Sequence, residues 1–348
     1  MGCRCHPSAP FITLPTLENF SWDGCDVASK PHVGLATWEA ACYNQLLMTD
    51  HTAPIVFYNR YTQQLEQEKI LGERGLRWVY GSALGQLSLH LLLKRAFFSR
   101  LVGALKNTRR SAQELPAFVE EYGINTDEMA QPLESYKSFN EFFVRKLRPG
   151  ARPICPGETL ALPADGRHSG WQDAAEIQQV FVKGQSFDLP ALLGNKELAA
   201  RYEHGAVLLS RLCPVDYHRF HFPAAGVPTA PVRIPGPLAS VSPYSLRGKL
   251  AWLWTNKREV TLLQTEKAGQ IAIIAIGATG VGAIYQTYKP GQAVQKGDEM
   301  GYFAFGGSTI MCLFEPGRVQ LAADLLEQTA QGRELYARQG DVLGELMS

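Results

Sequence analysis

The sequence predicts an α+β protein in which a helical N-terminal region precedes a β-rich domain with hairpins of the barrel-sandwich kind. Three observations indicate this. Apolar residues recur at spacings of three and four from about residue 74 to 110. After about residue 150, short apolar runs alternate with Gly and Pro turns, the spacing of strands. A Gly-Asp turn between strand-like pieces occurs twice near the C-terminus. The 348 residues are long enough for two domains.

We divide the chain into a leader, residues 1–52, a helical region, 53–134, and the β-rich domain, 135–348. The leader has Pro and Gly punctuation, and we assign it no role. It carries no apolar signal-peptide core, and His6 breaks the myristoylation pattern after Gly2. The seven cysteines include no CxxC pair, so we expect free thiols in a reducing compartment. A net charge of +1 gives no sign of a nucleic-acid partner.

The segment from Arg74 to Gln113 contains no Asp or Glu. Large apolar residues such as Trp78, Phe97 and Leu101 lie between its cations, which are Arg74, Arg77, Lys94, Arg95, Arg100, Lys106, Arg109 and Arg110. A basic amphipathic helix is typical of a segment that lies in a membrane interface. The same pattern also suits a solvated basic face packed on a protein core. The longest uncharged apolar run, residues 78–93, is too short to span a bilayer.

More helices are predicted on either side of the boundary at residue 134. In residues 111–129, Gly123 suits a helix C-cap and Thr126 a new N-cap. Residues 135–154 are expected to form a helix that stops at Pro149-Gly150, with Phe139 and Leu147 on its apolar face. One late helix is expected at about residues 320–331.

The β-rich domain contains an internal echo. "VQKGDEMGYF" at 294–303 resembles "ARQGDVLGEL" at 337–346, and each copy has a second Gly three positions after its Asp. Two copies are too few for a solenoid, so we interpret them as paired hairpins.

The stretch "GYFAFGGSTIMCLF", 301–314, places Gly306-Gly307-Ser308-Thr309 between two apolar runs. Glycine inside a strand often marks a bulge, which is the simpler interpretation. The alternative is a peptide bond that the protein breaks itself. The Ser308 hydroxyl can attack the carbonyl of Gly307 through a five-membered ring, and glycine removes the Cβ that would oppose this approach.

Histidines and carboxylates offer partners for such a hydroxyl. "PVDYHRFHFP" contains Asp216, His218 and His221. In a regular strand the two histidines point to opposite faces, which suits two separate roles better than one metal. We find no compelling third ligand for a metal. Asp165, in "LPADGRHSG", is either an ordinary turn residue or a carboxylate that orients a histidine. The rival polar candidates are His168, Asp173 and Asp216.

A charged cluster, "TNKREV", contains Asn256, Arg258 and Glu259 between apolar runs. It suits an internal pair, a phosphate site or a solvated turn, and the sequence does not choose among them.

Taken together, these blocks resemble the phosphatidylserine decarboxylases. The resemblance covers about residues 55–315 and rests on blocks in family order: "YNRYTQQLEQEKILG", "LRWVYG", "SFNEFFVRKLRPGARPI", "LPADGR", "VKGQSFDLPALLG", "RLCPVDYHRFHFPAAG", "TNKREV", "GATGVGAI" and "VQKGDEMGYFAFGGST". Each block alone is weakly specific, but the ordered set is highly specific. Gly306 departs from the family pattern, since many bacterial members have Leu there.

The resemblance implies a proenzyme that cleaves itself between Gly307 and Ser308. His221 would act as the base for Ser308, and Asp165 would orient His221. The products would be fragments 1–307 and 308–348, the second beginning with a covalent pyruvoyl group made from Ser308. That group would form a Schiff base with the substrate amine and accept electrons as CO2 leaves. His218 is the candidate proton donor.

The implied reaction converts phosphatidyl-L-serine to phosphatidylethanolamine and CO2. In this context the basic segment favours peripheral docking on a phospholipid membrane, at the cytoplasmic face if the source is bacterial. The two fragments would stay together, and dimers of the pair are usual in the family. Two alternatives remain at this point: a pyruvoyl-dependent decarboxylase of a free, aromatic amino acid, and an uncleaved membrane-bound scaffold.

Overall fold

A computed structural model of the chain describes residues 54–70, 75, 79, 82, 85, 96–180, 187–242, 245–246, 251–278, 283–304 and 308–347. All of these lie in one compact unit, Ala40–Ser348. The leader predicted for residues 1–52, and most of the basic segment before residue 96, lie outside the described residues. No helix in the part described is both long and apolar enough to cross a bilayer.

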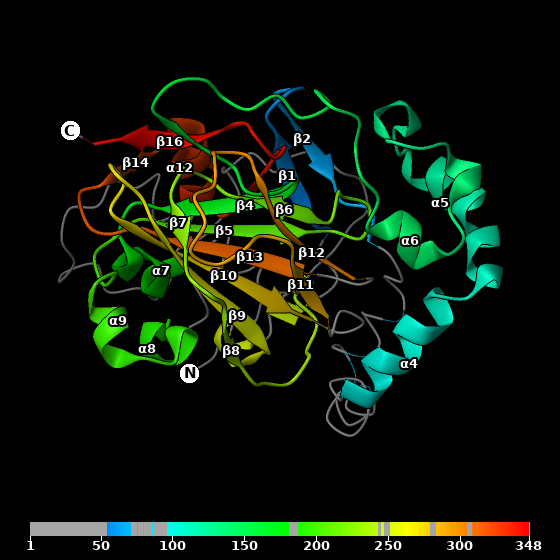
Figure 1. The fold of residues 1–348 in the computed structure, drawn as a ribbon, viewed down its shortest axis with the longest axis horizontal. Helices are drawn as coiled ribbons and strands as arrows, with labels where there is room; N and C mark the ends of the chain where they lie inside the picture. The colour runs from blue at the N-terminus through cyan, green and yellow to red at the C-terminus, as the bar shows by residue number, and fades with distance from the viewer. Residues whose placement is uncertain are drawn as a thin grey trace, which may run out of the picture. The chain divides into compact units, whose positions relative to one another are not determined.

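A ten-stranded sheet forms the centre of the unit (Figure 1). Its strand order is β2-β1-β15-β4-β5-β13-β10-β9-β7, with β8 also paired to β9. Only the β1–β15 pair is parallel. The strands are β1 (Val56–Asn59), β2 (Gln64–Gln67), β4 (Gly166–Trp171), β5 (Val207–Leu212), β7 (Val227–Pro228), β8 (Val232–Ile234), β9 (Arg258–Gln264), β10 (Gln270–Gly277), β13 (Ser308–Leu313) and β15 (Glu334–Ala337).

The central strands are buried on both faces, which explains why their sequences are apolar runs without alternation. In β10, Ile271 and Ile273 point into one core, while Ala272 and Ile274 point into the other. Strand residues alternate between faces, so each core receives every second side chain. The prediction of a strand-rich fold after residue 135 is confirmed, but the same sheet also contains β1 and β2, from the region 53–134 that was predicted to be helical.

Two three-stranded sheets cover one face of the large sheet. One has the order β11-β12-β6 and the other β14-β16-β3. Their strands are β3 (Thr159–Ala161), β6 (Arg219–His221), β11 (Ile284–Gln286), β12 (Glu299–Phe303), β14 (Val319–Leu321) and β16 (Val342–Leu346). Their inward residues, among them Phe220, Phe303, Leu160 and Leu343, pack in one core with the large sheet.

The sequence echo corresponds to two equivalent turn-and-strand units, which end in β12 and β16 of these small sheets. The predicted paired hairpins are wrong, because β15 and β16 on either side of the second turn pair in different sheets. Gly297 and Gly340 both have positive φ, 88° and 92°, in the turns before β12 and β16. A Cβ on Gly340 would collide with the carbonyl oxygen of Pro153, and a Cβ on either glycine would press against Ile154. The two turns therefore meet at one side chain, and both positions require glycine.

Backbone hydrogen bonds repeat the same correspondence across the two sheets. The N–H of Ala161 donates to the Pro223 carbonyl at 2.9 Å, and the N–H of His221 donates to the Pro163 carbonyl at 2.7 Å. The two donors are separated along the chain by the same number of residues as the two acceptors. Each segment therefore hydrogen-bonds to the other in the same way. This crossing places His221 and the chain just before Asp165 side by side.

Helices cover the other face of the large sheet: α7 (Ala174–Val180), α8 (Leu189–Leu193), α9 (Lys196–Ala200) and α11 (Trp252–Thr255) (Figure 1). The late helix predicted at 320–331 is α12 (Ala323–Ala330), and residues 319–321 before it form β14 instead.

A separate aromatic cluster holds α4 (Ala96–Lys106), the 3-10 turn Arg109–Glu114, α5 (Leu115–Tyr122) and α6 (Phe139–Phe143). Gly123 caps α5 in the left-handed conformation, as predicted. Asn125, not Thr126, caps the following turn, Thr126–Glu128, by accepting from the N–H of Asp127. A further 3-10 turn spans Leu133–Ser135. The cluster includes residues on both sides of 134/135, and this domain boundary stays a prediction.

The helix expected over residues 135–154 is wrong beyond Phe143. Ser138 caps α6 by accepting from the N–H of Glu141 at 3.1 Å, as its sequence suggests. The chain then leaves the helix because its backbone pairs with an earlier segment: Arg148 N–H donates to the Glu128 carbonyl at 2.8 Å. Leu147 forms a bridge to Met129 and does not lie on a helical face.

The elements after residue 307 are threaded among those before it. β13 lies between β5 and β10, and β15 lies between β1 and β4. In a small sheet, β16 pairs with β3 on one side. Of the described strands from residue 308 onward, β13, β15 and β16 each pair with an earlier strand. The described pairing of β14 is with β16.

Candidate active site

Ser308 is the first residue of β13, where Gly277 of β10 and Leu212 of β5 lie opposite it. Its side chain is fully buried, and its Oγ has no hydrogen-bond partner among the described residues. Strand alternation puts Ser308 on the face of Ile310 and Cys312, toward the small sheets. Gly307 lies outside the described residues. A buried hydroxyl without a partner is uncommon in folded proteins and calls for an explanation in terms of chemistry.

His221, at the end of β6, has only 9% of its surface exposed. Its Nδ1 has no hydrogen-bond partner within the described part of the chain, and its ring stacks on Tyr217 with centroids 5.8 Å apart. Burial lowers the pKa of His221 to about 4, against smaller opposite effects of Glu299 and Asp165. The imidazole is therefore neutral at physiological pH and can accept a proton.

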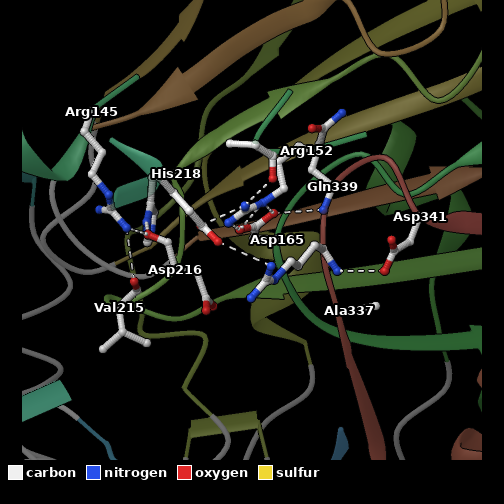
Figure 2. Close-up of polar contacts among 12 residues, drawn as sticks. Arg145, Arg152, Asp165, Val215, Asp216, His218, Ala337, Gln339 and Asp341 are labelled. Carbon is white, nitrogen blue, oxygen red and sulfur yellow. Dashed lines mark hydrogen bonds and ion pairs between the residues drawn. The ribbon is translucent and has the colours of Figure 1, made fainter. Parts of the chain in front are cut away.

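Asp165 is held by Arg152, as Figure 2 shows. Arg152 Nε lies 2.9 Å from Oδ1 and Nη2 lies 2.6 Å from Oδ2, while the N–H of Gln339 donates to Oδ1 at 2.8 Å. The structure shows Asp165 near enough to affect His221 electrostatically, but its hydrogen bonds go to these two residues. Its orienting role toward His221 stays a prediction.

His218 occupies different surroundings from His221, as the strand argument predicts. It is fully buried, its ring lies 3.9 Å from that of Phe143, and its Nδ1 lies 3.0 Å from the Asp216 carbonyl oxygen. A carbonyl can only accept, so this contact assigns the proton to Nδ1.

The structure gives each rival candidate other partners. His168 is satisfied on both ring nitrogens, by Ser210 Oγ at 2.9 Å and the Ala337 carbonyl at 3.1 Å. Asp216 accepts two contacts from the Arg167 guanidinium, at 2.7 and 2.5 Å. Asp173 contacts His204 at 3.2 Å on the surface. All three residues therefore have partners within the fold, and a catalytic role for any of them stays a prediction.

The "TNKREV" cluster is an internal network, so the solvated-turn interpretation is wrong. Arg258 donates to the carbonyls of Leu192 at 2.7 Å, Asn256 at 2.8 Å and Ala191. Asn256 is fully buried and donates to the Gly277 carbonyl at 2.9 Å. It thereby fixes the end of β10 that lies opposite Ser308.

Sequence reasoning missed two arginines near the site, Arg145 and Arg152. Arg145 lies in the stretch expected to be helical, and Arg152 lies just after its expected end at Pro149-Gly150. The signal that could have found Arg152 is its place in an extended Pro-containing segment, "RPGARPI", which cannot continue a helix.

The described residues contain no group of three His, Cys, Asp or Glu placed to hold a metal ion. The three cysteines that the structure describes, Cys155, Cys213 and Cys312, are buried free thiols.

The β-rich fold thus buries a serine at a strand start, two histidines and a carboxylate, which are residue types that acid–base enzymes use. Residues 139–342 match the family model described as phosphatidylserine decarboxylase. The chain belongs to this family, whose members are carboxy-lyases.

Curated relatives agree over most of the chain. A protein of Chlamydia trachomatis serovar D is 41% identical over 295 residues, which are 84% of this chain and 98% of the relative. One from Fusobacterium nucleatum is 41% identical over 83% of this chain and 97% of its own length. Both are named phosphatidylserine decarboxylase proenzyme. The family membership supports the main prediction from the sequence and favours neither alternative.

Proposed function

We propose that this chain is the proenzyme of a phosphatidylserine decarboxylase and cleaves itself at Gly307-Ser308. The observation that carries the proposal is the buried, unpartnered Ser308 hydroxyl at the start of β13. Its oxygen attacks the Gly307 carbonyl carbon, the C–N bond breaks, and an ester replaces the amide. β-Elimination then breaks the Ser308 Cβ–O bond and releases a chain that ends in the Gly307 carboxylate. Hydrolysis of the remaining dehydroalanine releases ammonia and leaves a ketone.

His221 is the proposed base for this cleavage. Its depressed pKa keeps it neutral, and its Nδ1 has no competing partner among the described residues. Asp165 supports the developing positive charge on the ring, since its negative charge acts to raise the pKa of His221.

The residues present fit a covalent pyruvoyl group, because a serine that starts a strand becomes a chain terminus there when the preceding bond breaks. Once formed, the group supplies an electron sink for decarboxylation. Ser308 lies fully buried, so the surrounding strands exclude water from the reacting atoms. We assign His218 the return of a proton to the product carbon through Nε2. The Asp216 carbonyl holds the Nδ1–H and Phe143 packs on the ring, so the transferred proton is one that Nε2 takes up from solvent and then delivers.

The proposal is tested by intact mass and a denaturing gel. Wild-type protein should give two fragments, 1–307 and 308–348, with the serine nitrogen lost from the smaller. Ser308→Ala should stay full length. Ser245→Ala is a matched control, because Ser245 is also buried with an unpartnered hydroxyl in the described structure and should cleave normally. Fragments that persist in Ser308→Ala would refute the cleavage site.

We also propose that the protein docks peripherally on an anionic membrane through α4. Phe97, Leu101 and Leu105 are 75%, 48% and 59% exposed, and their spacing of four places them on one helix face. Exposed Arg109 and Arg110 follow directly. An apolar stripe beside cations is the pattern of an interfacial helix.

Vesicle sedimentation tests this docking. Serine at the three stripe positions should weaken binding to anionic vesicles at least tenfold, whereas Val232→Ser, at an apolar residue 62% exposed on β8, should not. Equal binding by both variants would contradict the assignment. Activity on phosphatidylserine vesicles, compared with free aromatic amino acids, then separates the lipid substrate from the amino-acid alternative.

A further inference from the structure

A cavity of about 270 Å³ adjoins the site and has Asp165 in its wall. Four arginines line it: Arg145, Arg152, Arg167 and Arg338. Three of them are neutralised. Arg152 pairs with Asp165 at 2.6 Å, Arg167 with Asp216 at 2.5 Å, and Arg338 with Glu128 at 3.4 Å.

Arg145 is the exception among these four. It is 6% exposed, yet no carboxylate of the described residues lies within 4.0 Å of it. Nη2 makes two long contacts of 3.4 Å, to the carbonyls of Val215 and Asp216, and Nη1 has no hydrogen-bond partner in the described structure. The guanidinium also lies 4.8 Å from the Phe142 ring (Figure 2 shows its approach to Val215 and Asp216).

A buried guanidinium without an anion is costly, because an uncompensated charge loses its hydration. Burial accordingly lowers the pKa of Arg145, against the pull of Asp165 and Asp216. A buried arginine of this kind is expected where an anionic ligand binds and compensates its charge. The planar fork of arginine suits oxyanions with two oxygens in one plane, such as phosphate and carboxylate.

The position of Arg145 relates it to the chemistry. Its Nη2 and the Nδ1 of His218 both contact the carbonyl oxygen of Asp216. The Arg145 guanidinium and the ring of the proposed proton donor therefore meet at one carbonyl group.

Resting on the proposed function, we propose that Arg145 binds the phosphodiester of the lipid substrate and so favours a phospholipid over a free amino acid. The substrate offers a phosphodiester and a carboxylate. A cation on the carboxylate would stabilise a charge that disappears as CO2 leaves, and this would oppose the reaction. The phosphodiester keeps its charge throughout, so its binding is uniform and affects KM more than kcat.

The test measures binding in the uncleaved Ser308→Ala protein, so that it does not depend on the pyruvoyl group. The probe is dihexanoyl-phosphatidylethanolamine below its micellar concentration, which has the phosphodiester and lacks the carboxylate. Adding Arg145→Met should raise its Kd at least tenfold. Arg148→Met, at an exposed arginine of the same segment outside the cavity, should leave Kd within twofold.

Arg145→Lys keeps the charge but loses the fork. In the cleavage-competent chain it should raise KM for phosphatidylserine several-fold with kcat within twofold. It also serves if Arg145→Met fails to fold, which circular dichroism would show. Unchanged Kd in Arg145→Met, or unchanged KM in Arg145→Lys, would overturn the proposal. A kcat loss without a KM change would show that Arg145 acts in the transition state and not on the phosphodiester, and it would also overturn the proposal. Intact mass reports the cleavage separately, so failure of the proposed function is recognised on its own.

Discussion

Removing Arg152 should destabilise the fold more than removing the charge of its partner Asp165. Their side chains are 10% and 3% exposed, and three N–H···O contacts of 2.6–3.0 Å join them. In Arg152→Met, Asp165 keeps only the N–H of Gln339 and remains a buried charge. That loss should cost about 3–5 kcal/mol of unfolding free energy. In Asp165→Asn, Arg152 keeps Glu128 at 2.8 Å, so we expect about 1–2 kcal/mol.

Urea unfolding measures this asymmetry, in the Ser308→Ala background so that the unfolding chain stays in one piece. The double variant should be less unstable than the sum of the singles, with a coupling of about 2 kcal/mol. Arg201→Met removes an exposed arginine paired with Glu315 at 3.5 Å, and as the matched control it should cost less than about 0.5 kcal/mol. If Arg152→Met costs no more than this control, the argument from burial is refuted.

Three further predictions concern stability, each measured by urea unfolding in the same background. Gly340→Ala should cost more than about 2 kcal/mol of unfolding free energy, since φ is 92° and the added Cβ would collide with the carbonyl oxygen of Pro153. Gly317→Ala is the control: its φ is 69° but the space around it is open, so it should cost only about 1 kcal/mol. Equal losses would contradict the packing argument. Burial lowers the pKa of His221 to about 4 and of His168 to about 3, below the ordinary 6.5. Below pH 6.5 the unfolded chain therefore binds more protons than the folded chain. The free energy of unfolding should fall by on the order of 5 kcal/mol between pH 7 and 4.5, and these two histidines should not change it above pH 7. Ser210→Ala should cost about 1–3 kcal/mol by leaving the Nδ1 of His168 without its partner, and a neutral result would refute the assigned contact.

The sequence was sufficient for features that depend on neighbours along the chain. Strand spacing after residue 150 identified the strand-rich part of the chain, and the Gly-Asp echo identified two equivalent turns, because positive-φ turns need particular residues wherever they occur. The pairing of the strands beside those turns was not predicted, because their partners come from other segments. The burial of Ser308 between two apolar strands also follows from its flanks.

Features that depend on segments distant in the sequence could not be predicted from local patterns. His168 looked like a rival catalytic residue because its partners, Ser210 and Ala337, come from other strands. The helix expected through Leu147 ends early because a backbone segment near Glu128 competes for its hydrogen bonds. Arg145 becomes notable only once the surrounding carboxylates are seen to be paired with other cations.

Because β13 and β15 each lie between two earlier strands, the protein can fold readily only as one continuous chain. Each of these strands reaches its position in the sheet only while the polypeptide is continuous. A separate fragment of about forty residues would have to find two positions between other strands by diffusion. Under the proposed cleavage, the protein folds once as a single chain, and a cleaved molecule that unfolds no longer has the covalent link that guided these strands. Its longevity should be governed by how slowly it opens rather than by a reversible equilibrium.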